Sequence, residues 1–237
     1  MKTIITIGRQ FGSGGRVIGK ALAEHYQIPY YDKDILTMAA KESGLCEELF
    51  ESHDEKPTNS FLYSLVMDTY SLGYSTSAFT DMPINYKVFL AQFDAIKKIA
   101  AEGPCVIVGR CADYALTDFD NVVNVFIHAD LDKRAEIIAH RYDLEVDKAK
   151  DKVLKMDKKR ASYYNYYSNK KWGDAKGYDI CINSVCVGIE GATNLIIDLV
   201  NAFEAERGKN VVAEIIQRKT EFAEKSGQEP KKEGNKE

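Results

Sequence analysis

The sequence has no C-x-x-C motif, although five cysteines are spread over its 237 residues. An odd number of well-separated cysteines in a chain of this length is typical of reduced thiols, and it argues against a disulfide framework or a zinc site. Long apolar runs are missing too, since none approaches the roughly 18 residues of a membrane-spanning helix. Gly8 and Arg9 end the first apolar run before it could form the core of a signal peptide. We therefore expect a cytoplasmic protein that has no membrane partner.

Neither sign of charge dominates the composition. The 32 lysines and arginines are balanced by 36 aspartates and glutamates, which leaves a net charge of −4. A chain with this balance gives no reason to expect non-specific binding to nucleic acid. Hydrophobic residues make up 45% of the sequence, which suits one globular domain of the larger kind or a domain with an inserted lobe.

The stretch from residue 3 to residue 23 (TIITIGRQFGSGGRVIGKALA) joins a β-branched run to a glycine-rich turn and then to a helical pattern. Four glycines fall within eight residues: Gly8, Gly12, Gly14 and Gly15. Glycine permits positive φ angles and lets backbone amides approach an anion, and the following helix directs its first N–H groups to the same point. The stretch therefore predicts a binding site for a polyphosphate, with a tight structural turn as the alternative.

The loop departs from the common Walker A pattern, G-x-x-x-x-G-K-[ST]. If the second glycine of that pattern is placed on Gly14, its lysine falls on Gly15 and its hydroxyl residue on Arg16. Its first glycine falls on Arg9. Arg16 is then the cation nearest in sequence to the missing lysine, and we expect it to stabilise the charge of the transferred phosphoryl group. The alternative is that its side chain points away from the loop and pairs with a carboxylate such as Asp32.

Four further short apolar segments predict strands, at residues 27–32, 105–110, 122–129 and 178–183. Runs that are apolar at every position suit strands buried on both faces of a parallel sheet. Helical patterns lie between them, at residues 34–44, at 89–100, after Asp130 as a helix cap, and at 189–203. The alternation predicts a three-layer α/β domain.

Charged residues follow several of these predicted strands. Asp32 ends the second strand, and Arg110 and Asp113 follow the third. Ligands of such sheets bind beyond the carboxyl ends of the strands. Any one of these residues could be a solvated loop residue, but together with the glycine loop they favour a common site.

A basic segment spans residues 143–175. Nine lysines and arginines alternate there with three aspartates, and four tyrosines and the single tryptophan follow: Lys148, Lys150, Lys152, Lys155, Lys158, Lys159, Arg160, Lys170, Lys171, Asp147, Asp151, Asp157, Tyr163, Tyr164, Tyr166, Tyr167 and Trp172. The pattern fits a solvated helix, and more distantly a nucleic-acid-binding surface. A cationic lid over a triphosphate explains its position in the chain better, because phosphoryl transfer needs cations and exclusion of water.

Several of these stretches together resemble a known family. They are GRQFGSGGRVIGKALAE, YYDKDIL, VIVGRCADY, VFIHADLDKRAE and DKKRASYYNYYSNKKWGDAKGYDICINS. The resemblance is to the cytidylate kinase-like branch of the P-loop nucleoside monophosphate kinases, and it extends over about residues 2–205. It implies a P-loop fold with a five-stranded parallel sheet, ATP and Mg²⁺ at the glycine loop, a monophosphate-binding insertion after the second strand, and a helical lid that carries arginines.

The resemblance also implies roles for individual residues. The nucleotide-binding loop corresponds to Gly12, Ser13, Gly14, Gly15 and Arg16. Acceptor-binding residues correspond to Asp32, Arg110 and Asp113, the last two as a G-R-x-x-D variation on the family's G-R-D. The charge-stabilising arginines correspond to Arg16, Arg134, Arg141 and Arg160. No set of magnesium ligands is indicated.

Two departures from authentic cytidylate kinases bear on the function. Those enzymes have G-x-G-K-G-[ST] where this chain has GSGGRV, and they have an arginine where Met38 stands. The first departure concerns catalysis and magnesium placement, and the second concerns cytidylate as the substrate. The leading prediction is an ATP-dependent kinase that phosphorylates a nucleoside monophosphate such as CMP. A kinase for another small molecule and a nucleotide-binding protein with little or no catalysis are the alternatives.

These interpretations divide the chain into one kinase domain and a tail. The kinase domain is predicted over residues 1–206, with a mobile acceptor-binding lobe at 45–85 and the basic lid at 143–175. A helix is predicted at 207–226 and disorder at 227–237, where charged residues without apolar partners cannot offset the entropy of ordering.

Overall fold

The computed structural model describes residues 1–44, 48, 84–207 and 209. Within these residues, five parallel strands form one sheet in the spatial order β2-β3-β1-β4-β5. The strands are β1 (Ile4–Arg9), β2 (Tyr30–Tyr31), β3 (Val106–Val108), β4 (Val122–His128) and β5 (Ile180–Asn183). The predicted α/β class and five-stranded parallel sheet are therefore confirmed. The predicted acceptor lobe, the C-terminal helix and the disordered tail lie almost wholly outside the described residues.

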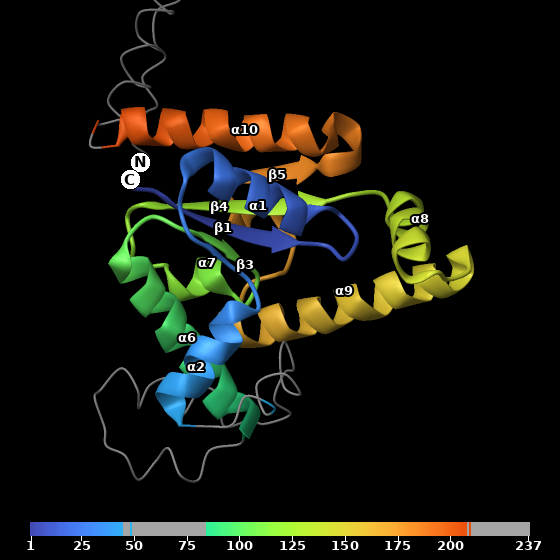
Figure 1. Cartoon of the computed structure of the whole chain (residues 1–237), viewed down its shortest axis with the longest axis horizontal. Coiled ribbons are helices and arrows are strands. Elements are labelled where there is room, and N and C mark those ends of the chain that lie inside the picture. The colour runs from blue at the N-terminus through green and yellow to red at the C-terminus, as the bar shows by residue number, and fades with distance from the viewer. Residues whose placement is uncertain (45–47, 49–83, 208, 210–237) are drawn as a thin grey trace, which may run out of the picture.

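Helices cover both faces of the sheet (Figure 1). One face carries α1 (Gly15–Tyr26) and α10 (Ser184–Glu206), and the other carries α2 (Asp34–Ser43), α6 (Ile84–Glu102) and α7 (Ala112–Ala115). Alternate side chains of the central strand serve the two cores: Ile5 and Ile7 pack with α1 and α10, whereas Ile4 packs with α2 and α6. All three are fully buried, which explains why the strand is apolar at nearly every position.

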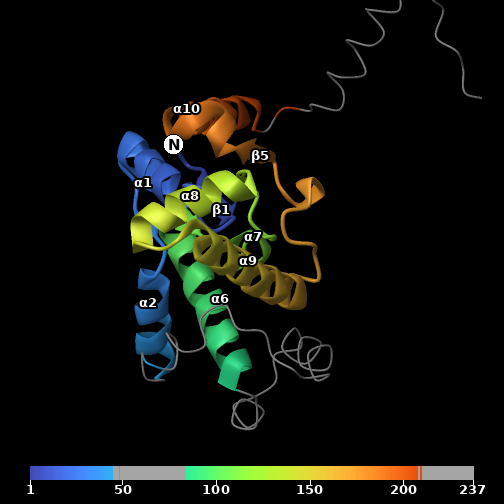
Figure 2. The same ribbon diagram turned by 90° about the vertical axis from the view of Figure 1, so that its right-hand side faces the viewer.

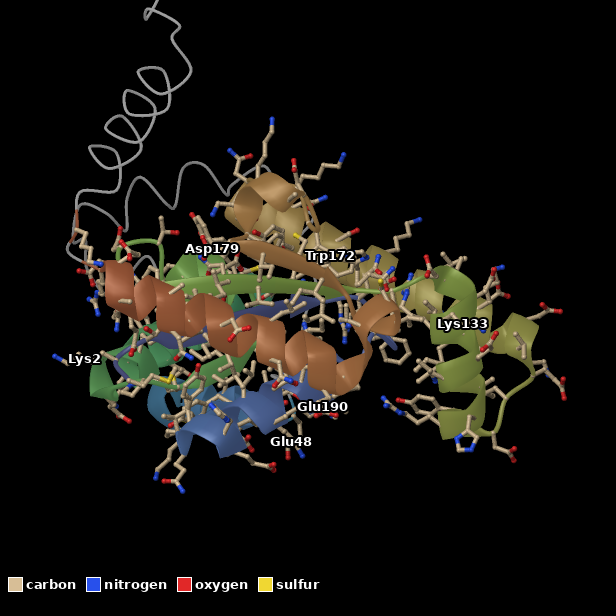
Figure 3. The ribbon with its side chains drawn as sticks, turned by 90° about the horizontal axis from the view of Figure 1, so that it is seen from above. Lys2, Glu48, Lys133, Trp172, Asp179 and Glu190 are labelled. Atoms are coloured by element: carbon tan, nitrogen blue, oxygen red, sulfur yellow. The ribbon has the colours of Figure 1, made fainter. Side chains whose placement is uncertain are left out.

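Two helices lie beyond the carboxyl ends of the strands. They are α8 (Leu131–Tyr142) and α9 (Val146–Ser168), which face the viewer in Figure 2. Seen from above, α10 runs along the sheet and α8, marked by Lys133, stands past the strand ends (Figure 3). The two helices pack through Ile138 and Ala139 of α8 and Ala149 and Val153 of α9. The predicted basic segment is thus held to the domain by a narrow apolar stripe.

The second half of α9 packs against α6 through aromatic side chains. Tyr167 is fully buried and stacks on Phe89, with ring centroids 3.9 Å apart and planes 9° apart. Tyr163 lies edge-on to the same phenylalanine, and its hydroxyl is 3.3 Å from Oε1 of Gln92. Stacked and edge-to-face rings add specific geometry to the burial of their area. The tyrosines that follow the lysines therefore anchor this end of α9.

Several element boundaries differ from the sequence-based prediction. Strand β2 covers only Tyr30–Tyr31, and the proline before it accepts a hydrogen bond from Val106 but has no N–H to donate. Helix α6 begins at Ile84, five residues before the predicted start. Asp130 stands at the N-cap of α8 as predicted, but its side chain makes no capping hydrogen bond. Helix α10 is kinked at Gly188 (φ 73°), directly before the predicted start at residue 189.

One described helix, α10, is long and apolar enough to cross a membrane when only length and composition are considered. Such a helix is weak evidence for a membrane span, because core helices of globular domains pass the same test. In this structure Ala192, Ile196 and Val200 of α10 are fully buried against α1 and the sheet. One face of the helix therefore packs on the α/β core, whereas Val185, Val187, Ile189 and Leu195 are exposed.

The carboxylate of Glu204, near the end of α10, fixes the start of the chain. Its Oε1 accepts hydrogen bonds from the backbone N–H of Lys2 (2.6 Å) and of Thr3 (3.0 Å) and from the Thr3 hydroxyl (2.8 Å). Burial raises the pKa of Glu204, but the hydrogen bonds from Lys2 and Thr3 outweigh it, and the pKa lies below its ordinary value of 4.5. The ionised carboxylate therefore stabilises the junction between β1 and α10.

We expect Glu204→Ala to lower the free energy of unfolding by about 1–3 kcal/mol at pH 7, because the fully buried Thr3 loses its acceptor. A carboxyl group whose pKa is lower in the folded state than in the unfolded state stabilises the folded state at pH values above the unfolded-state pKa. The difference between wild type and variant should therefore shrink as the pH falls below 4.5. Thermal melts from pH 3 to 7 measure it. Glu206→Ala, which removes an exposed pair with Lys209, is the control, and equal losses in both variants would contradict this role.

Candidate functional site

The loop between β1 and α1 depends on glycine for its shape. Gly12 (φ 84°) and Gly14 (φ 80°) both adopt the left-handed conformation. A Cβ atom on Gly14 would lie 2.6 Å from Cδ1 of Ile189, and one on Gly12 would lie 3.1 Å from the carbonyl oxygen of Arg134. The loop is therefore pressed between α8 and α10, and neither position accepts a side chain without strain.

Side chains fix the loop from below. The Ser13 hydroxyl lies 2.9 Å from the carbonyl oxygen of Gln10 and 3.1 Å from that of Ile127. Ser184, at the start of α10, donates to the Ser13 carbonyl at 2.7 Å. The amide oxygen of Gln10 accepts from the backbone N–H of Ala129 at 3.1 Å. The Ser13 hydroxyl thus points into the protein, and the backbone N–H of Ser13 also donates to the Gln10 carbonyl, at 3.3 Å, so this residue shapes the loop.

The upper side of the loop presents backbone donors. Within the described part of the chain, the N–H groups of Gly12, Gly14, Gly15 and Arg16 have no hydrogen-bond acceptor. Gly15 and Arg16 form the first turn of α1, where the helix dipole adds positive potential. Several free N–H groups around a left-handed turn form an anion-binding concavity. The geometry suits a phosphate group.

Asp157 of α9 connects the glycine loop to helices α8 and α9. Its Oδ1 accepts from the backbone N–H of Phe11 at 2.7 Å, and its Oδ2 lies 2.5 Å from Nη1 of Arg134. Arg134, which is 4% exposed, also donates to the carbonyl oxygens of Ala129 (2.8 Å) and Phe11 (3.1 Å). The charge of Arg134 is therefore used to hold α8, α9 and the loop together. We call this group, Phe11, Arg134 and Asp157, the loop latch.

A cavity of about 300 Å³ opens above the loop. Its basic lining residues are Arg9, Arg16, Lys33, Arg110, Arg141, Lys159 and Arg160. These residues come from β1, α1, the turns after β2 and β3, and helices α8 and α9. Concentrated positive charge with low-dielectric walls attracts polyanions strongly. We call this space the loop cavity.

Asp32 faces two arginines at the edge of the loop cavity. Its carboxylate lies 2.5 Å from Nη2 of Arg16 and 3.2 Å from Nη1 of Arg110. Arg110 is 4% exposed, whereas half of the Arg16 side chain is exposed. The Arg16 side chain therefore leans across the mouth of the cavity toward β2. The group carries a net positive charge, which suits an anionic ligand.

The turn after β3 is strained. Gly109, Arg110 and Cys111 all have positive φ angles, of 83°, 54° and 55°. Such angles are uncommon for residues other than glycine and cost about 1–2 kcal/mol each. Strain of this kind persists where the surroundings hold it and is frequent at binding sites. Here it turns the Arg110 guanidinium back toward Asp32.

Asp113 lies in a second, smaller cavity beside the first. The cavity measures about 20 Å³, which is room for about one water molecule. The Tyr164 hydroxyl donates to Oδ2 of Asp113 at 2.5 Å. Burial raises the pKa of Asp113, and burial together with the neighbouring carboxylate raises the pKa of Tyr164. The pair forms a polar centre that a ligand could reach only by displacing the tyrosine.

Helices α8 and α9 supply further cations of the loop cavity. Arg160 donates to the carbonyl oxygen of Arg9 at 3.2 Å and lies over the Phe11 ring, 5.5 Å from its centroid. Arg141, at the end of α8, is exposed and lines the loop cavity. Arg134 and Arg141 share a face of α8, as the seven-residue spacing predicts, but only Arg141 is directed to the cavity.

Magnesium would have one carboxylate within reach. In the described ranges, no three His, Cys, Asp or Glu side chains come together as a metal site, and Asp32 is the one carboxylate that lines the loop cavity. Mg²⁺ in kinases is commonly held by one or two carboxylates, water and the substrate phosphates. Asp32 is itself paired with Arg16 and Arg110, so the described residues contain no preformed carboxylate site for the ion.

Comparison with known proteins places this site in a family. The sequence model of the cytidylate kinase-like family matches residues 4–185. The chain belongs to the cytidylate kinase-like family. It is 27% identical over 197 residues to a cytidylate kinase of Pyrococcus horikoshii, covering 82% of this chain and 86% of that protein. It is 24% identical over 196 residues to one of Methanococcus aeolicus, covering 81% and 94%.

A solved structure is more similar than these relatives. The crystal structure of an uncharacterized protein from Eubacterium ventriosum superposes with a TM-score of 0.65 at 34% identity, and it covers 85% of this chain and 99% of that protein. The fold that the two proteins share thus covers 85% of this chain. The phosphotransferase class follows from the family.

In this cytidylate kinase-like protein most of the predicted site residues come together. The loop cavity is lined by Gly12, Gly14, Gly15, Arg16, Asp32, Arg110, Arg141 and Arg160. Ser13 lies beneath it, Arg134 lies in the loop latch, and Asp113 lies in the neighbouring small cavity. Their roles in binding and catalysis stay predictions.

The sequence analysis assigned no role to three residues of the site. Arg9 lines both cavities, Phe11 joins the loop latch, and Gly109 begins the strained turn. A signal existed for Arg9, because a charged residue at the end of an apolar strand lies at the ligand-binding edge of the sheet. The role of Phe11 rests on its backbone N–H, which residue identity does not reveal.

Proposed function

We propose that this protein transfers the γ-phosphoryl group of ATP to a nucleoside monophosphate, with CMP as the first acceptor to test. The observation that carries the proposal is the glycine loop, whose free N–H groups open into a cavity lined by cations. Triphosphate binding requires both features. Family membership and the relatives named cytidylate kinases support the choice of acceptor.

The proposed reaction needs positioning and charge more than covalent chemistry. The bond from the γ-phosphorus to its bridging oxygen breaks, ADP leaves with the electron pair, and a new bond forms to an oxygen of the acceptor phosphate. That oxygen is already ionised near neutral pH, so no general base is required. The loop amides hold the donor phosphates, and Arg16, Arg141 and Arg160 neutralise charge around them. Mg²⁺, when present with the nucleotide, would supply further positive charge at the phosphates.

The acceptor would bind on the other side of the cavity. Asp32 and Arg110 stand where the acceptor phosphate and sugar could be held, and Asp113 would receive its base after Tyr164 moves. Arg134 acts indirectly in this scheme, because its guanidinium is engaged in the loop latch. It is a positioning residue for the loop.

A panel of acceptors tests the proposal. Purified full-length protein is incubated with MgATP and, in turn, with CMP, dCMP, UMP, AMP, GMP and several hydroxylated small metabolites. We expect ADP and a nucleoside diphosphate to appear in equal amounts with at least one monophosphate. Equimolar ADP and a phosphorylated metabolite would instead identify a small-molecule kinase.

A second candidate is a nucleotide-binding protein with weak or no catalysis. The observation that favours it is the pair of residues Gly15 and Arg16, which supply neither the lysine nor the hydroxyl of a Walker A loop. Both candidates predict MgATP binding. Tight binding without ADP release for any acceptor would support the second candidate and contradict the first.

A further inference from the structure

The positions of a glycine and a cation are exchanged in this loop. In the pattern G-x-x-x-x-G-K, the first glycine corresponds to Arg9 and the lysine to Gly15. The two residues touch in the structure: a Cβ atom on Gly15 would lie 2.7 Å from Cβ of Arg9 and 3.2 Å from its Cγ. The Arg9 side chain therefore covers the point at which a lysine at position 15 would leave the backbone.

The Arg9 guanidinium reaches from β1 to the turn after β3. It packs on the backbone of Gly109, where a Cβ atom would lie 2.2 Å from Nη1 and 2.6 Å from Cζ. Arg9 is 6% exposed and lines both the loop cavity and the small cavity that holds Asp113. Its charge thus lies at the floor of the site, between the loop and the proposed acceptor side.

The other arginines near the loop are placed differently. Arg134 does not line the loop cavity, and the Arg110 guanidinium lies at its edge beside Asp32. Arg16 is half exposed and directed across the cavity mouth to the same aspartate. A lysine in the common pattern contacts the donor phosphates from within the loop. The Arg9 side chain borders Gly15, the position of that lysine, and lines the loop cavity.

We infer that Arg9 supplies the donor-phosphate cation that lysine supplies in other P-loop kinases, and that Gly15 is the compensating change that makes room for it. The inference rests on the proposed kinase function. A guanidinium can bind phosphate oxygens through two parallel N–H groups, and its position at a strand end holds it rigidly. It would act on the phosphates of the donor and on the charge that develops during transfer.

The exchange can be reversed by mutation. We expect Arg9→Met to raise the dissociation constant of MgATP at least about tenfold and to lower kcat/KM about a hundredfold. Gly15→Lys alone should also fail, because its side chain collides with Arg9. The double variant Arg9→Gly/Gly15→Lys restores the common pattern, and it should regain at least about tenfold over each single variant. Affinity is measured by calorimetric titration with MgATP and turnover by ADP release.

Two further variants make the result interpretable. Arg207→Met is the matched control, because Arg207 pairs with Asp120 at the opposite edge of the sheet, and it should behave as wild type. Arg16→Met tests the competing residue. Thermal melts of all variants identify any that fail to fold, and for those the comparison rests on Arg9→Lys, which keeps a cation and should retain more activity than Arg9→Met.

Three outcomes would overturn the inference. They are wild-type affinity and turnover in Arg9→Met, a larger loss in Arg16→Met than in Arg9→Met, and a double variant no better than Gly15→Lys. Failure of the proposed function looks different, because the wild-type protein itself would then bind no MgATP or phosphorylate no acceptor. The first of these wild-type results would remove both proposals.

Discussion

Alanine in place of Asp157 is expected to lower the free energy of unfolding by about 3–5 kcal/mol, because the Arg134 guanidinium would stay buried without its carboxylate. The N–H of Phe11 loses its acceptor in the same variant. The loop then keeps its contacts with Arg160 of α9 but not the one with Asp157, and we expect the dissociation constant of MgATP to rise at least about tenfold. Urea unfolding and calorimetric titration measure the two effects.

A second pair between the same helices provides the control. Asp132 of α8 lies 2.6 Å from Lys150 of α9, with side chains 78% and 41% exposed. Exposed pairs of this kind contribute about 0–1 kcal/mol, so Asp132→Ala should change stability little and MgATP affinity not at all. Similar losses in the two variants would show that general packing of α8 and α9, and not the loop latch, is what matters.

Removing both charges separates stability from function. In Arg134→Met/Asp157→Leu no buried charge is left unpaired, and replacing a buried pair by apolar residues is often neutral or stabilising. We therefore expect the double variant to recover most of the stability lost in Asp157→Ala. It should not recover MgATP affinity, because Phe11 still lacks its acceptor. Recovery of both properties would contradict a role of the latch in positioning the loop.

Alanine at Gly109 is expected to be similarly damaging. The residue has a φ of 83°, which costs a residue with a Cβ atom about 1–2 kcal/mol. The added Cβ would also overlap the Arg9 guanidinium, 2.2 Å from Nη1, and overpacking typically costs a further 1–3 kcal/mol or so. We expect a total loss of about 2–5 kcal/mol in urea unfolding, together with a fall in kcat/KM comparable to that of Arg9→Met.

Gly44 supplies the comparison for this substitution. It ends α2 with a φ of 71°, and no atom lies within 4 Å of the position that a Cβ would take. Gly44→Ala therefore measures the backbone penalty alone, which should be about 1–2 kcal/mol. If Gly109→Ala cost no more than Gly44→Ala, the Arg9 side chain would have to be mobile and not held against the turn.

The spacing of apolar residues along the chain predicted most of the fold. The apolar runs of β1 and β3 are buried on both faces, so their composition carries the signal for a parallel sheet directly. Boundaries were less predictable where tertiary contacts decide them. Helix α6 extends to Ile84 because Tyr86 and Phe89 pack on Tyr167, which lies about 80 residues away in sequence.

The site shows the limit of sequence patterns more clearly. Arg16 and Asp32 were both predicted, and the structure joins them in the ion pair that was the alternative to a phosphate-facing Arg16. The sequence alone does not decide between these two directions of a long, half-exposed side chain. Arg134 and Arg141 lie seven residues apart on one helix, but Arg134 is buried whereas Arg141 lines the loop cavity. Arg9 and Gly15 are six positions apart, and their contact depends on the left-handed turns of the loop. Side-chain direction, and not residue type, is what the sequence leaves open.

Helix α9 contacts both ends of the site as a single continuous element. It is 23 residues long, about 33 Å at the usual rise per residue. Asp157, near its middle, accepts a hydrogen bond from Phe11 of the glycine loop, and Tyr164, toward its end, donates one to Asp113. A ligand that displaces Tyr164 by shifting α9 would therefore also shift Asp157, which holds Phe11. Donor and acceptor affinities should then be thermodynamically linked, each ligand changing the binding constant of the other by an equal factor.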